Sequence, residues 1–290
     1  MTREELVKHA KLFQSEEITG YQVYKNLVKS TNDKNNKAVL SRIAGEELKH
    51  YSIFKQVSGV DVPPKKSKVW FYTICGKLLG LTFALRLMER EEENIQMVYE
   101  RIIPYMPEVE AVKKSEEEHE DQLIELIQEE RLNYAGSIVL GLNDALVELT
   151  GALAGFSLAM QNTKLIAVAG LITGIAASLS MAASQYLSVK TENDQRHAGK
   201  SALYTGLAYI FTVAILIAPF LLLSNYLMAL VITLLLAIAI IFIFNFYIAV
   251  AKNLNFKNRF IEMVVISLSV SALTFVIGIL VRNYMGIPVD

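Results

Sequence analysis

Two copies of one pattern of metal-ligand residues stand in the first 132 positions of the 290-residue chain. Each copy has a glutamate, a tyrosine seven residues later, and then a Glu-x-x-His pair. The copies are Glu17, Tyr24, Glu47 and His50, followed by Glu92, Tyr99, Glu116 and His119. Positions i and i+3 of a helix share a face, so a carboxylate and an imidazole at that spacing can reach the same metal. The repeat therefore predicts a two-metal centre inside a helical bundle.

The predicted ligands of this centre are Glu17, Glu47, His50, Glu92, Glu116 and His119. Carboxylates combined with imidazole suit iron or manganese rather than copper(I) or structural zinc. Two choices stay open. Glu16 is an alternative to Glu17, and Glu89, one turn before Glu92, is an alternative or additional ligand. Tyr24 and Tyr99 are expected to donate hydrogen bonds to ligand carboxylates.

A second pair of carboxylates lies in an apolar stretch, GLNDALVELTGALAG, which holds Asp144 and Glu148. A carboxylate in the middle of a membrane span costs about 2.5–3.5 kcal/mol on insertion scales and marks an ion or proton path. The alternative is that both lie near the end of the span and reach the headgroups. The glycines around them favour a helix that packs on other helices, and therefore a functional, buried pair.

A methionine in the next apolar stretch, Met181, offers a thioether, which suits late first-row metals and is of no use to Mg²⁺. Methionine is also a common packing residue, so its value depends on the carboxylates beside it. The spacing of Asp144 and Glu148 places two like charges on one helix face, where double ionisation is resisted. An arriving divalent ion is therefore expected to displace a proton, which would couple metal and proton movement.

The elements that position these residues are all predicted to be helical. The pattern of apolar residues and breaks predicts soluble helices over about 3–30, 34–58, 69–103 and 107–132. Five apolar stretches follow, over about 136–160, 165–187, 202–223, 227–250 and 261–281, each long enough to cross a bilayer. The expected fold is all-α, with a four-helix bundle over 1–132 and a five-span membrane domain over 133–290.

One more run, residues 69–88, is apolar enough to resemble a further span. If it crossed the membrane, Glu17 and Glu92 would lie on opposite sides and the six-ligand centre could not form. Lys77 in its middle also disfavours a span. We therefore expect this run to be part of a bundle helix that lies in a dimer contact or on the bilayer surface.

Charge and composition narrow the remaining options. Most of the 28 basic and 29 acidic residues precede the first apolar stretch, and the net charge is −1, so no nucleic acid is expected as a partner. The single cysteine excludes an intrachain disulfide and a CxxC metal site. The charged start MTREELVKHAKLF lacks the apolar region expected of a signal peptide, and basic residues gather in the second and fourth connections between spans. This pattern predicts a cytoplasmic bundle and a C-terminus on the opposite side. A compact chain without a targeting segment suits a prokaryotic plasma membrane at least as well as an internal, vacuole-like compartment.

The first two apolar stretches resemble the vacuolar iron transporter family. The resemblance rests on GLNDALVELTGALAG and on the end of the second stretch, SMAASQYLSVK. It implies a five-helix protomer that forms a homodimer, with Asp144 and Met181 lining an ion path between the protomers. This sequence has Ser137 where better-known members have another aspartate, and Glu148 is a candidate to replace it. It also lacks their glutamate-rich segment between the second and third helices.

Residues 1–132 resemble the rubrerythrin-type members of the ferritin-like superfamily, and the order of the two halves is similar to that of membrane-bound ferritins fused to vacuolar iron transporters. The resemblance implies a di-iron centre that binds or oxidises Fe(II). The expected function is export of Fe²⁺ or Mn²⁺ from the cytoplasm in exchange for H⁺, with a bundle that captures or oxidises iron. The alternative is a membrane-anchored di-iron ferroxidase or peroxide-scavenging enzyme.

Overall fold

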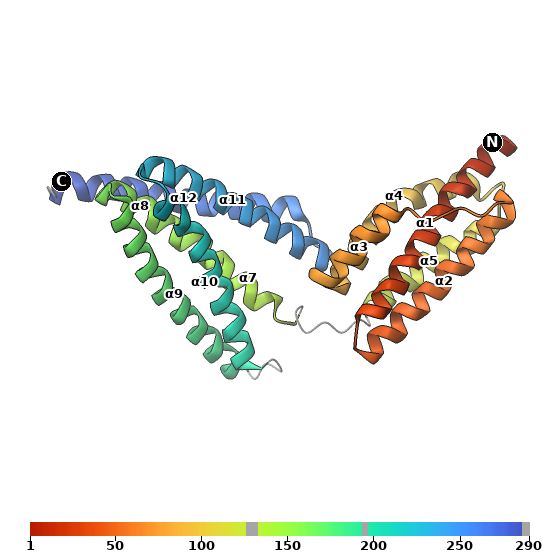
Figure 1. The fold of residues 1–290 in the computed structure, drawn as a ribbon, viewed down its shortest axis with the longest axis horizontal. Helices are drawn as coiled ribbons and strands as arrows, with labels where there is room; N and C mark the ends of the chain where they lie inside the picture. The colour runs from red at the N-terminus through yellow and green to blue at the C-terminus, as the bar shows by residue number, and fades with distance from the viewer. Residues whose placement is uncertain (126–132, 193–196, 286–290) are drawn as a thin grey trace. The chain divides into compact units, whose positions relative to one another are not determined.

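The computed structural model describes residues 1–125, 133–192 and 197–285, and the side chains of 92–97, 117–125 and 285 lie outside the described part. All the elements in these ranges are helices, which confirms the predicted all-α class (Figure 1). The chain divides into two compact units, Met1–Glu129 and Glu130–Asp290, which are described separately.

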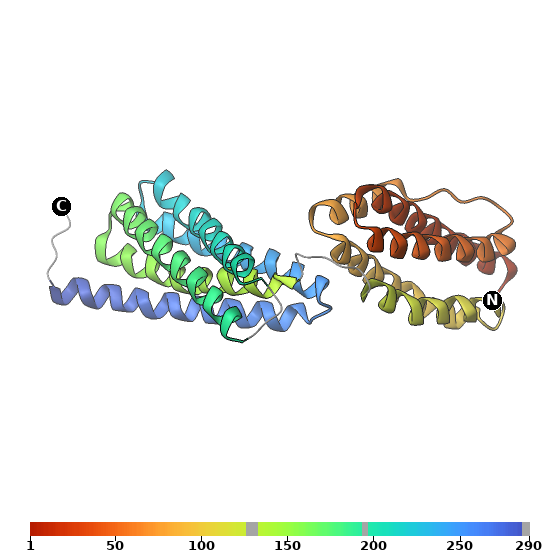
Figure 2. The ribbon, with the colours of Figure 1, turned by 90° about the horizontal axis from the view of Figure 1, so that it is seen from below.

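The first unit begins with a helical hairpin. Helices α1 (Arg3–Ser30) and α2 (Lys34–Ser58) run antiparallel and pack along their length, as Figures 1 and 2 show. Thr2 and Glu5 form a reciprocal capping box at the start of α1, and the Asp33 side chain accepts from the amide of Asn36 at the start of α2. These caps satisfy amides that a helix terminus leaves without partners. The sequence boundaries predicted for both helices agree with the structure.

The predicted third bundle helix is two helices. Helix α3 (Lys66–Leu78) and helix α4 (Leu81–Ile102) are separated at Gly80, whose φ is +114°. Only glycine adopts that backbone conformation without a steric cost. Gly80 therefore divides into two helices a run that is continuously apolar in the sequence. Helix α3 therefore has 13 residues, well below the ~20 that a span requires. The run 69–88 does not form a membrane-competent helix among the described residues.

The apolar core of the first unit consists of two clusters. One contains Val23 and Leu27 of α1 with Leu40 of α2, and the other contains Phe13 of α1 and Phe54 of α2. Helix α5 (Glu108–Glu125) packs on α4 and α2 and adds its own apolar residues to the second cluster. On each of α1 and α2, a polar stretch separates the residues of one cluster from those of the other. This stretch carries the predicted ligands of these two helices, Glu17, Glu47 and His50.

The second unit contains five helices that are long and apolar enough to cross a membrane, counted over the described residues. They are Ala135–Met160, Thr163–Thr191, Ala198–Leu222, Tyr226–Ala251 and Phe256–Tyr284. The first consists of α7 (Ala135–Asp144), the π-helical segment η1 (Ala145–Leu149) and α8 (Thr150–Met160), and the others are α9 (Thr163–Thr191), α10 (Ala198–Leu222), α11 (Tyr226–Ala251) and α12 (Phe256–Met285). Among the described residues, a membrane-competent helix therefore stands at each of the five predicted spans.

Close helix contacts fix the arrangement of this unit. Helix α9 packs along α10, α7 packs on α10, and α8 packs on α12 (Figure 2). At the crossing of α8 and α12, a β-carbon on Gly278 would lie 2.5 Å from the carbonyl oxygen of Gly155. No larger residue fits there, as expected for helices that associate through small residues. The first span thus lies between α10 and α12 and is the central helix of the unit.

Candidate metal centre and ion path

Three buried ligand-type side chains meet inside the first unit. Nδ1 of His50 lies 3.5 Å from Oε2 of Glu17 and 3.5 Å from Oε1 of Glu116. One ligand atom from each of the three residues lies within 4.8 Å of the others, and all three residues are buried. They come from α1, α2 and α5, so the bundle brings together residues that are up to 99 positions apart in the sequence. Glu17 and His50 come from the first copy of the repeat, and Glu116 comes from the second.

Glu47 is also directed into this region. It lies one turn before His50 on α2 and is buried, and its carboxylate packs against Gly20 of α1. A β-carbon on Gly20 would lie 3.0 Å from Cδ and Oε2 of Glu47. Because Gly20 follows Glu17 by three residues on the same helix face, the carboxylates of Glu17 and Glu47 approach the same side of α1.

An aromatic wall closes one side of the cluster. The Tyr99 hydroxyl donates to Oε1 of Glu17 at 3.4 Å, and the Tyr99 ring packs edge-on against Phe13 with centroids 4.8 Å apart. Phe54 completes the wall from α2, 5.2 Å from Phe13. The apolar rings keep the Tyr99 hydroxyl aimed at the carboxylate and exclude water from that side.

The two alternative glutamates, Glu16 and Glu89, each have a basic partner in the structure. Glu16 forms ion pairs with Lys65 and Lys68, on a different face of α1 from Glu17. Glu89 accepts from Arg86 one turn earlier on its own helix, at 2.8 Å. The other two predicted ligands, Glu92 and His119, lie outside the described side chains. Tyr24 is buried within the first apolar cluster.

The donor set fits a divalent cation with a preference for oxygen and imidazole ligands. Two buried carboxylates that share one imidazole leave an excess of negative charge even when the histidine is protonated. Such an arrangement is stabilised when a cation lies between the groups. Carboxylate and imidazole ligands without thiolate are those expected for iron or manganese.

In the second unit, the two intramembrane carboxylates flank an irregularity in the first span. Asp144 is the last residue of α7, and Glu148 lies within the π-helical segment η1. The two carboxyl groups are four residues apart on the same span and interact electrostatically. A π-helical turn in an α-helix occurs frequently at functional sites, because it widens the helix and releases backbone carbonyls from the regular pattern. The sequence carries no signal for this segment.

A tyrosine that sequence reasoning missed anchors one of these carboxylates. The Tyr209 hydroxyl of α10 donates to Oε2 of Glu148 at 3.0 Å, and Tyr209 is fully buried. Glu148 itself is exposed on the isolated protomer, whereas Asp144 is half-buried. The only sequence signal for this contact is a tyrosine in an otherwise apolar span. Its partner lies on another helix, so spacing along the sequence does not identify it.

Hydroxyl groups of the fifth span, together with Thr150 of the first span, form hydrogen bonds around the π-helical segment. Ser267 of α12 donates to the carbonyl oxygen of Leu146 at 2.9 Å, and Thr150 donates to the same oxygen. Ser271 donates to the Thr150 hydroxyl at 3.2 Å, and Thr274 donates to the Gly151 carbonyl at 2.6 Å. In an apolar environment such unpaired carbonyls would be costly, so these side chains stabilise the irregular backbone beside the carboxylates.

The second apolar motif lies on the adjacent helix. Met181 of α9 is half-buried and packs against the apolar core of the unit, and α9 itself contacts η1. One turn further, the Gln185 amide donates to the Ser137 hydroxyl at 3.3 Å, which ties α9 to α7. Ser137 is therefore a buried helix-packing contact in this chain.

These features define an integral membrane protein with a polar, carboxylate-bearing first span. Comparison with known protein families adds that residues 135–200 match the VIT family, a range that covers the first two spans and their connection. This match lies over Asp144, Glu148 and Met181 and indicates a membrane metal-ion transporter. No curated protein and no solved structure matched the chain.

Proposed function

We propose that this protein exports a divalent transition metal, Fe²⁺ or Mn²⁺, from the cytoplasm in exchange for protons. The observation that carries the proposal is the Asp144–Glu148 pair at a π-helical turn inside the first span, where Tyr209 holds Glu148. An anchor helix has no need of two carboxylates in an apolar segment. The VIT-family match over the same residues supports the assignment.

Proton coupling follows from the proximity of the two carboxyl groups. Like charges this close resist double ionisation in an apolar seam, so the pair retains a proton when no metal is bound. A divalent cation favours the doubly ionised pair, and the proton then leaves. Metal entry and proton release are therefore linked at one site, and Met181 supplies a soft group that favours transition metals over Mg²⁺.

A homodimer would explain the exposure of Glu148. A carboxylate on the outer surface of a membrane helix would face lipid, which is unfavourable, so a second copy or a water-filled path must cover it. The family resemblance supports an ion path between two protomers. The basic residues in the second and fourth connections support a cytoplasmic bundle and a C-terminus on the opposite side.

The soluble unit is proposed to be a ferritin-like metal-capture domain. Glu17, His50 and Glu116 would hold a metal with Glu47 beside them, and the repeat adds Glu92 and His119. A bound iron pair would supply the redox chemistry by which ferritin-like proteins oxidise Fe(II). The chain's own residues bind the cation and exclude water, and the Tyr99 hydroxyl orients Glu17.

The buried Glu17–His50–Glu116 cluster also favours the second candidate, a membrane-anchored ferroxidase or peroxide-scavenging enzyme. Flux measurements on the full chain in proteoliposomes separate the two. We expect Fe²⁺ or Mn²⁺ uptake with a matching internal pH change, both lost in Asp144→Asn. Glu262→Gln, which removes an exposed carboxylate from the start of α12, is the matched control. Equal flux in wild type and Asp144→Asn would reject the transporter and favour the anchored enzyme.

A further inference from the structure

Helix α3 of the first unit carries an apolar stripe on its outer face. Trp70 is 67 % exposed and Phe71 is 47 % exposed, and Ile74 continues the stripe as a half-buried residue. Positions 70, 71 and 74 lie on one face of a helix because they are separated by one, three and four residues. Exposed aromatic residues that are contiguous in this way mark an interaction surface rather than ordinary surface variation.

The opposite face of α3 is fixed in the core, so the stripe cannot rotate inward. Tyr72, Cys75 and Gly76 are buried, and Gly76 lies directly against the Leu27 side chain of α1. Any residue larger than glycine at position 76 would displace this contact. The exposure of Trp70 and Phe71 is therefore a consequence of how the helix packs.

Lysines flank the stripe. Lys66 and Lys77 are exposed and lie together on one flank of α3. They also line the groove between α3 and α1, together with Gln22, Asn26, Pro64, Val69, Trp70, Thr73 and Ile74. An aromatic stripe with basic residues at its edge is the pattern of helices that lie in a membrane interface, where lysines meet anionic headgroups and tryptophan lies at the headgroup level.

The chain itself keeps this surface near a bilayer. The last described residue of the first unit is Glu125, and the first span begins at Ala135. A connection of that length reaches roughly 36 Å at most, at about 3.6 Å per residue. The soluble unit is therefore tethered to the membrane unit by a short connection, which raises the effective concentration of lipid around α3.

From these observations we propose that α3 docks on the anionic surface of the bilayer in which the spans reside. Trp70 and Phe71 enter the boundary between headgroups and acyl chains, and Lys66 and Lys77 contact anionic headgroups. The helix lies on the membrane and does not cross it, because its 13 residues are too few. Docking holds the metal-binding bundle at the membrane surface.

Trp70 is the single tryptophan of the chain, so its fluorescence reports on this surface without any labelling. The full chain is reconstituted in liposomes whose lipids carry bromine either near the headgroup or near the end of the acyl chain. We expect stronger quenching by the shallow bromines, weaker quenching in purely zwitterionic lipid, and protection of Trp70 from acrylamide in anionic lipid.

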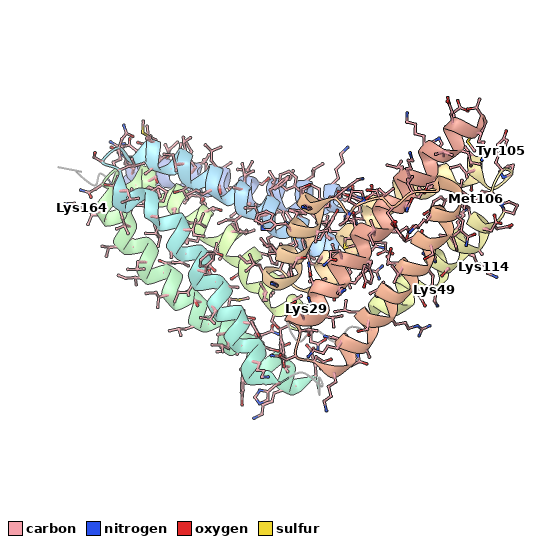
Figure 3. All side chains as sticks on the ribbon, turned by 45° about the vertical axis from the view of Figure 1, so that its right-hand side comes forward. Lys29, Lys49, Tyr105, Met106, Lys114 and Lys164 are labelled. Carbon is pink, nitrogen blue, oxygen red and sulfur yellow. The ribbon has the colours of Figure 1, made fainter. Side chains whose placement is uncertain are left out.

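Variants test the two contributions separately. Lys66→Gln with Lys77→Gln should lower the ratio of docked to undocked chains by roughly 25-fold, since each lysine near an anionic surface contributes about five-fold, or about 1 kcal/mol. The matched control is Lys37→Gln with Lys49→Gln, two exposed lysines of α2, of which Lys49 is labelled in Figure 3. Phe71→Glu should abolish docking, whereas Leu48→Glu, at an exposed apolar position of α2, should not.

The wild-type measurement decides the proposal even if a variant fails to fold. Trp70 that is open to acrylamide and insensitive to bromine means that the stripe stays in water, which overturns the proposal. Trp70 that is shielded from both quenchers means that protein covers it, for example a second copy, and this also overturns the proposal. Stronger quenching by the deep bromines would contradict a surface location.

Discussion

The Tyr209 hydroxyl lies 3.0 Å from Oε2 of Glu148, and this contact joins a fully buried side chain to an exposed one. Tyr209 reaches Glu148 from the interior of the membrane unit, through α10, so it restrains the carboxylate from the side opposite to its open face. A hydrogen bond to a charged acceptor contributes about 1.5–3 kcal/mol. The contact therefore fixes the orientation in which Glu148 meets an ion.

Tyr209→Phe removes this hydrogen bond and keeps the ring. We expect metal flux in proteoliposomes to fall about ten-fold or more, because the lost contact corresponds to at least about 1.5 kcal/mol. Tyr204→Phe is the matched control, since Tyr204 lies on the same helix and stacks on Tyr134 through its ring. Normal flux in Tyr209→Phe, or an equal loss in Tyr204→Phe, would contradict a specific role for the hydroxyl.

His50→Ala should lower the metal content of the full chain, as measured by elemental analysis after anaerobic loading with Fe²⁺. Removal of the imidazole leaves the Glu17 and Glu116 carboxylates facing each other without the ligand that lies 3.5 Å from both. Glu16→Gln serves as the control, because Glu16 pairs with Lys65 and Lys68 instead. The assignment fails if metal content is unchanged in His50→Ala or falls equally in both variants.

Alanine substitutions at two glycines of the α1–α2 hairpin should have opposite effects on stability. Gly45→Ala meets no atom within 4 Å and lies inside α2, so it should stabilise the fold by about 0.5–1 kcal/mol. Gly20→Ala places a methyl group 3.0 Å from the Glu47 carboxylate, so it should lower the melting temperature and also reduce metal binding. A Gly20→Ala variant that melts and binds metal as wild type does would mean that Glu47 can move without consequence.

Ser267→Ala removes one of the two hydroxyl donors to the Leu146 carbonyl. We expect a loss of about 1 kcal/mol in stability in detergent, and a non-additive effect when Ser267→Ala is combined with Thr150→Ala, because both serve the same oxygen. Ser269→Ala, at an exposed position on the same helix, should have little effect. Additive losses in the double variant would show that the two hydroxyls act independently of the π-helical segment.

Burial raises the pKa of the Cys75 thiol. The reactive form is the thiolate, so at pH 7–8 a smaller fraction of Cys75 is reactive than of a free thiol, and the fraction increases only at higher pH. Alkylation of the folded chain should therefore be slow at pH 7.5, become faster toward pH 9–10, and be rapid after unfolding. A rate equal to that of a free thiol at pH 7.5 would mean that α3 does not bury this face.

The sequence alone determined the helical class, the five spans and the repeat of ligand residues, because these depend on periodicity and composition. An apolar stretch of about 20 residues is a sufficient condition for a candidate span, whatever surrounds it. The repeat likewise depends on spacing along single helices. The boundaries of α1 and α2 also agreed with prediction, since their caps are formed by neighbouring residues.

Only the tertiary structure decided features that depend on contacts between distant segments. The break at Gly80, the pairing of Glu16 with lysines while Glu17 meets His50, and the hydrogen bond from Tyr209 to Glu148 all belong to this kind. Adjacent glutamates of a helix have similar local surroundings, and what separates them is the element that each one faces. The π-helical turn follows the same rule, because its carbonyl at Leu146 is satisfied by Ser267, which lies 121 residues further along the chain.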